Sequence, residues 1–60
     1  MRDIDRINKV TARLAELWKT VPDWRFMQLI DNLQRWVGND MFYYEDDRFI
    51  DVLEKFLGED

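Results

Sequence analysis

The sequence contains no cysteine, no histidine and no serine, and only one proline and two glycines among its 60 residues. Without cysteine the chain can form no disulfide and offers no thiolate to a metal ion. The absence of histidine removes the commonest metal ligand and the commonest general base, so no catalytic triad of the Ser-His-Asp or Cys-His type can be built. We therefore expect a protein that is not an enzyme and that carries no cofactor.

Long apolar runs and basic clusters are missing as well. No stretch approaches the ~18 apolar residues of a membrane-spanning helix, and the charged beginning "MRDIDRINKV" is unlike a signal peptide. These absences predict a soluble, cytoplasmic protein with no membrane partner. Direct nucleic-acid binding is not expected either, because it would need a basic patch or stripe.

What the chain does have is apolar and aromatic material, at 47% and 15% of its residues. Apolar side chains recur at steps of three and four along three segments, which is the pattern of amphipathic helices. The scarcity of proline and glycine is typical of an ordered chain. We therefore expect one all-α domain over residues 1–60, a compact three-helix domain with helices at about 3–20, 24–37 and 46–57.

The expected helix ends coincide with residues that begin or stop helices. Asp3 is suited to cap the first helix, and Pro22 disfavours helical geometry at the residue before it, which ends that helix. Asp23 is then placed to cap the second helix. Gly38 and Gly58 follow the second and third helices, at the position where a left-handed residue usually closes a helix.

Charge is unevenly distributed along the chain, although the net charge is only −4. Residues 1–20 carry five basic and three acidic side chains, whereas residues 39–60 carry two basic and eight acidic ones. This gradient favours head-to-tail or antiparallel pairing between copies, or binding to a basic partner.

The stretch "MFYYEDD" joins the second and third helices through an aromatic connector at 41–45. The connector is too short to bury four large side chains, so we expect two of them to fill the core and two to remain at the surface. Trp18 and Phe26 are assigned to the core, whereas Trp24 lies off the apolar stripe. Aromatic residues are enriched at binding hot spots, which predicts an interaction surface. Its expected members are Trp24, Trp36, Met41, Phe42, Tyr43, Tyr44, Glu45, Asp46 and Asp47.

The carboxylates of this stretch have several interpretations. Glu45, Asp46 and Asp47 sit where a helix begins, and acids there are stabilised by the positive end of the helix dipole. A metal site is an alternative, but the acids lack the regular spacing and the glycine of a calcium loop. Paired carboxylates for acid–base catalysis are a weaker one, because 60 residues leave little room for a cleft. A further alternative is that the acids of residues 39–60 imitate nucleic-acid phosphates toward a basic protein.

The run "RINKVTARLAELWKTVPDWRFMQLIDNL" and the ending "DMFYYEDDRFIDVLEKFL" resemble small uncharacterised bacterial and phage proteins similar to the YihD-like family of unknown function. The resemblance covers residues 6 to about 57. It implies a helical domain, provides no active site to transfer, and suggests an accessory protein of phage or prophage type that engages a host protein.

Together these observations predict a small non-catalytic binding module. We expect a homodimer that forms through the aromatic surface, with a possible host protein as a second partner. The acidic nucleic-acid mimic and the carboxylate metal site remain as alternatives.

Overall fold

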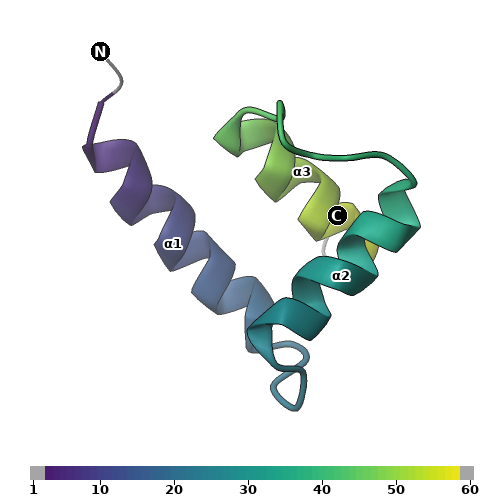
Figure 1. Cartoon of the computed structure of the whole chain (residues 1–60). Coiled ribbons are helices and arrows are strands. Elements are labelled where there is room, and N and C mark those ends of the chain that lie inside the picture. Colours follow the sequence, from purple (N-terminus) through teal and green to yellow (C-terminus); the bar gives the residue numbers. More distant parts are fainter. Residues whose placement is uncertain (1–2, 59–60) are drawn as a thin grey trace.

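The computed structural model describes residues 3–58, which form three helices and no strand (Figure 1). The helices are α1 (Asp5–Trp18), α2 (Phe26–Val37) and α3 (Asp46–Leu57). Figure 1 shows α1 and α2 diverging from the short connection between them, and α3 packs against both. The all-α, three-helix architecture predicted from the sequence is confirmed.

The core is small, and all three helices contribute to it. Its five buried side chains are Leu17 of α1, Leu29 and Leu33 of α2, and Val52 and Leu53 of α3. Partly buried apolar side chains surround this cluster, among them both Met41 and Tyr44 of the connector. A core of this size is expected to stabilise a 60-residue chain only marginally.

The second helix begins two residues later than predicted, and its cap is a different residue. Pro22 and Asp23 form a turn that is closed by the backbone N–H of Trp24 donating to the Val21 carbonyl at 3.0 Å. Proline is favoured at this position of a turn. Arg25, in an extended conformation, precedes the helix, and its backbone N–H donates to the Gln28 side chain at 2.8 Å. The prediction that Asp23 caps this helix is therefore wrong.

The other helix ends agree more closely with expectation. Gly38 and Gly58 follow α2 and α3 with φ angles of 81° and 76°, in the left-handed region that suits glycine. The carboxylate of Asp3 accepts a hydrogen bond from the backbone N–H of Asp5 at 3.0 Å, although the residue directly before α1 is Ile4. Asp3 thus accepts a hydrogen bond from an amide at the helix start, but it lies two residues before the helix and not directly before it.

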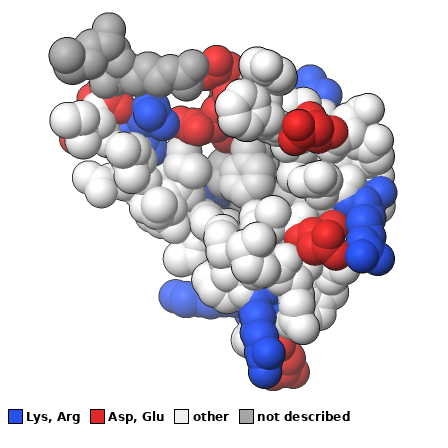
Figure 2. Space-filling model, viewed as in Figure 1, with Lys and Arg blue, Asp and Glu red and all other residues white. Residues whose placement is uncertain are grey.

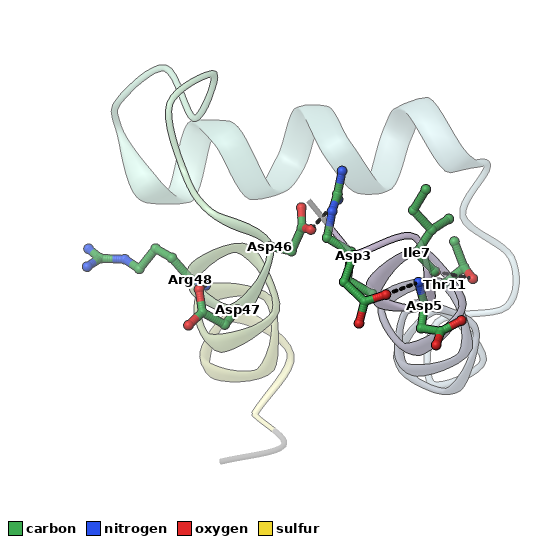
Figure 3. A network of polar contacts seen from close by, with 8 residues as sticks. Asp3, Asp5, Ile7, Thr11, Asp46, Asp47 and Arg48 are labelled. Carbon is green, nitrogen blue, oxygen red and sulfur yellow. Dashed lines mark hydrogen bonds and ion pairs between the residues drawn. The ribbon is translucent and has the colours of Figure 1, made fainter. Parts of the chain in front are cut away.

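A seam of opposite charges joins α1 to α3. Arg6 pairs with Asp46 at 2.5 Å, and Arg13 pairs with Glu54 at 2.8 Å. The order of these pairs means that α1 and α3 run in the same direction, and Figure 3 shows their first turns side by side. Part of the charge gradient predicted to attract a partner is therefore matched inside one chain.

Candidate interaction surface

The connector contains a tight turn that directs two of its four large side chains toward the core and two toward solvent. The backbone N–H of Tyr44 donates to the Met41 carbonyl at 3.0 Å, which places Phe42 and Tyr43 at the tip. Met41 and Tyr44 pack against the core. Phe42 and Tyr43 remain 78% and 88% exposed. The expectation that two of the four fill the core and two stay outside is confirmed, and we call residues 41–44 the aromatic turn.

The tip of the aromatic turn is itself ordered by local contacts. The rings of Phe42 and Tyr43 meet edge to face, with centroids 4.9 Å apart and planes at 83°. The Asp40 carboxylate accepts a hydrogen bond from the backbone N–H of Phe42 at 3.1 Å. Such an Asp–backbone bond is a common device for fixing a turn. The two rings are therefore presented in a defined geometry.

A second aromatic group lies where α2 and α3 meet. The Phe56 ring is 6.2 Å from that of Trp24 and 5.5 Å from that of Trp36. Trp24 and Phe56 are partly buried against the core, whereas Trp36 is 53% exposed. We call these three residues the tryptophan cluster. Phe56 was not among the residues predicted for the interaction surface, and only the approach of the two helices reveals its part in it.

Trp24 is more buried than predicted, and Phe26 is more exposed than predicted. Trp24 was expected at the surface, but it packs against the core and its carbonyl accepts a hydrogen bond from the Trp18 indole at 2.7 Å. Phe26 was expected in the core, yet it is 40% exposed and covers the Trp18 ring at 5.4 Å. Both differences follow from the turn at Pro22 and Asp23, which delays the helix and folds Trp24 inward.

The single surface predicted from the sequence is thus divided into two aromatic groups. Trp36 belongs to the tryptophan cluster, whereas Phe42 and Tyr43 form the tip of the aromatic turn. Within residues 3–58, no ring contact links one group to the other. Any interaction by one group can therefore be tested separately from an interaction by the other.

The carboxylates after the turn lie at the start of α3, as the helix-start interpretation predicts. Glu45 directly precedes the helix in an extended conformation, and Asp46 and Asp47 occupy its first turn. Asp46 also pairs with Arg6 across the seam, and Asp47 accepts a hydrogen bond from the backbone N–H of Arg48 (Figure 3). The Arg48 guanidinium lies 5.1 Å from the centre of the Tyr44 ring, a cation–π distance.

These contacts bear on the two alternatives for the acids. In the part of the chain that the structure describes, no group of three or more acidic side chains is arranged to hold a metal ion. Among residues 39–58, Asp46 pairs with Arg6, Asp51 with Lys55 and Glu54 with Arg13. A continuous row of phosphate-like charges is interrupted at these positions.

On the face seen in Figure 1, Figure 2 shows a hollow between α1 and α2 that is lined largely by residues other than Lys, Arg, Asp and Glu. Acidic and basic side chains lie at the upper border of this hollow and along the edge of the molecule. Large apolar side chains exposed on the molecule as a whole include Ile4, Met27, Trp36, Phe42 and Tyr43. Among residues 3–58, seven large apolar side chains are exposed and five apolar side chains are buried.

No family model, curated protein or solved structure matches the chain. The resemblance described above therefore remains a prediction. No helix among residues 3–58 has the length and apolar character that crossing a membrane requires.

Proposed function

We propose that the protein is a non-catalytic binding module that forms a homodimer through the tryptophan cluster. The observation that supports this proposal is the environment of Trp36, whose ring packs at a tilt against that of Phe56 while half of its surface stays in water. A large aromatic side chain on a partly buried aromatic base is typical of a binding hot spot.

Dimerisation would also supply stability that the small core lacks. Only five side chains among residues 3–58 are buried in one copy, and domains of this size without disulfides or metals commonly gain stability by association. In a two-fold dimer the same surface of both copies meets, so the interface contains one Trp36 from each copy. The partly buried rings of Trp24 and Phe56 would then lose their remaining contact with water.

Charges next to the tryptophan cluster do not oppose such a contact. Arg35 and Lys55 are the sequence neighbours of Trp36 and Phe56, and each pairs with an acid one turn earlier, Asp31 at 3.0 Å and Asp51 at 3.3 Å. Paired charges of mixed sign produce little repulsion when two identical surfaces approach each other.

The proposal is tested by the solution mass, measured by sedimentation equilibrium over a range of concentrations and at low and high salt. We expect a dimer whose dissociation constant changes little with salt, because the contact is apolar. Trp36→Gln should weaken it at least about tenfold, the usual effect at a hot spot.

Met27→Gln is the matched control. Met27 lies on α2, is 69% exposed, and is nine residues from Trp36, which places it on the opposite side of the helix. It should leave the dimer unchanged. A wild-type protein that is a monomer at every concentration, or equal losses in the two variants, would contradict the proposal.

The resemblance contributes a further part to the proposal, namely that the dimer engages a host protein as an accessory factor in the cytoplasm. Nothing in the geometry identifies that protein. The chemistry of the surface that would receive it can nevertheless be argued from the aromatic turn.

A further inference from the structure

The tip of the aromatic turn is not explained by the fold. Tight turns favour Gly, Pro, Asn, Asp and Ser at their centres, because these residues suit the backbone and tolerate water. Here the two central residues are Phe42 and Tyr43, whose rings contact each other and lie almost entirely in solvent. Large apolar side chains at such a position cost solubility and contribute little to the core. Their chemistry fits a surface that another molecule covers.

The aromatic turn is also prepared for binding. The Met41 and Tyr44 side chains anchor its two ends on the core, and the Asp40 carboxylate fixes the Phe42 amide. A surface already held in one geometry loses little conformational entropy when a partner binds. This distinguishes the aromatic turn from a flexible loop that happens to carry two aromatic residues.

Acidic side chains predominate around the tip. Residues 39–47 contain four acidic side chains and no basic one. Asp40, Glu45 and Asp47 are all exposed. The nearest basic side chain that follows, Arg48, lies over the Tyr44 ring. An apolar tip with an acidic rim is complementary to a partner that is apolar at its centre and basic at its edge.

A second copy of the chain does not fit this description through its own aromatic turn. Two aromatic turns brought together would place acidic rims against each other, and like charges across an interface are unfavourable. The basic side chains Arg6, Arg13 and Lys55 are engaged in ion pairs within the chain, whereas Lys9, Lys19 and Arg25 are exposed on other segments, so a second copy would have to approach through a different surface. This contrasts with the tryptophan cluster, where Arg35 and Lys55, next to Trp36 and Phe56, are each paired with an acid.

We propose that the aromatic turn is the docking surface for a basic amphipathic segment of another protein. The apolar side of the segment would cover Phe42 and Tyr43, and its Lys or Arg side chains would face Asp40 and Asp47. The inference rests on the proposed function of a binding module, but it uses a surface separate from the dimer contact.

The test measures binding of a dye-labelled model peptide by fluorescence anisotropy. The probe is an amphipathic peptide of Leu and Lys, about 14 residues long so that it can form a helix. A peptide with Glu in place of Lys serves as the control for charge. We expect the Lys peptide to bind and the Glu peptide not to bind, with affinity that falls between about 50 and about 500 mM salt but does not vanish.

Variants of the full chain then locate the site. The double variant Phe42→Ser with Tyr43→Ser should lower affinity at least about tenfold, and Asp47→Asn should lower it about two- to fivefold. The matched controls Met27→Gln and Asp23→Asn remove an apolar side chain and a charge elsewhere and should change it less than about twofold. Serine suits a turn, so the double variant should fold, which circular dichroism verifies.

Each outcome decides the inference. Peptide binding that survives loss of both rings but disappears at high salt would show simple attraction to an acidic protein and would overturn it. Conversion of a dimer to a monomer by the double variant would show that a second copy covers the turn, which would also overturn it. Absence of peptide binding in a chain that still forms the Trp36-dependent dimer rejects this inference and leaves the proposed function standing.

Discussion

The two aromatic groups of this molecule differ in what holds them in place. The rings of the tryptophan cluster belong to helices or to the segment that precedes one, and they contact each other across the boundary between α2 and α3. Phe42 and Tyr43 contact one another at the tip of a turn and reach nothing of the core. The first group therefore combines a role in the fold with an exposed edge, whereas the tip of the second contributes little to the fold. Exposure has a functional meaning mainly where packing does not already explain the residue.

The largest expected effect is a difference in stability between a substitution in the core and one at the tip of the aromatic turn. Leu53 is fully buried, so Leu53→Ala removes apolar contacts and leaves a cavity. It should lower the free energy of unfolding by about 2–5 kcal/mol. Phe42→Ala removes a larger side chain from a solvated position, and its effect should stay within about 0.5 kcal/mol. Urea denaturation of the two variants and the wild type measures both values.

If Phe42→Ala instead costs as much as Leu53→Ala, the aromatic turn is part of the core in solution, and the docking inference loses its starting point. Dilute protein should be used, so that dissociation of a dimer does not add to the measured stability.

The fold was largely predictable because helix periodicity depends on local spacing. Apolar residues at steps of three and four define a helix face without knowledge of what the face contacts, and Gly38 and Gly58 mark helix ends by their own backbone preference. The prediction was wrong at Asp23 because two local signals competed there. Pro22 and Asp23 favour a turn as strongly as Asp23 favours a helix cap, and the turn formed.

The surface was less predictable because it depends on how the helices are oriented. Residue type marked Trp24 and Trp36 as candidates for the surface but could not show that Phe56 lies against both. Arg6 and Arg13 lie seven residues apart on one helix, and Asp46 and Glu54 lie eight apart on another. That spacing was visible in the sequence, yet only the parallel packing of α1 and α3 shows that the charges meet.

A smaller effect tests the anchoring of the tryptophan cluster. The Trp18 indole donates a hydrogen bond to the Trp24 carbonyl, so Trp18→Phe keeps a ring but leaves that carbonyl without this donor. The expected loss of stability is about 1 kcal/mol. Trp36→Phe is the matched control, because the Trp36 indole makes no hydrogen bond within residues 3–58, and it should cost clearly less. Thermal unfolding followed by circular dichroism compares the two. Equal losses would mean that the Trp18 bond does not hold Trp24 in place.

The smallest expected effect concerns the charged seam, which is held by ion pairs and not by aromatic contacts. The pair between Arg13 and Glu54 joins two helices at 2.8 Å and is about one-third exposed on each side. A double-mutant cycle with Arg13→Gln and Glu54→Gln should give a coupling of about 0.2–1 kcal/mol that decreases as salt is added. The pair between Asp51 and Lys55 lies within one helix and serves as the reference, since such pairs contribute about 0.3–0.5 kcal/mol. A coupling near zero would show that the seam leaves Glu54 free to face a basic partner, and the acidic surface available for docking would then extend from the aromatic turn along α3.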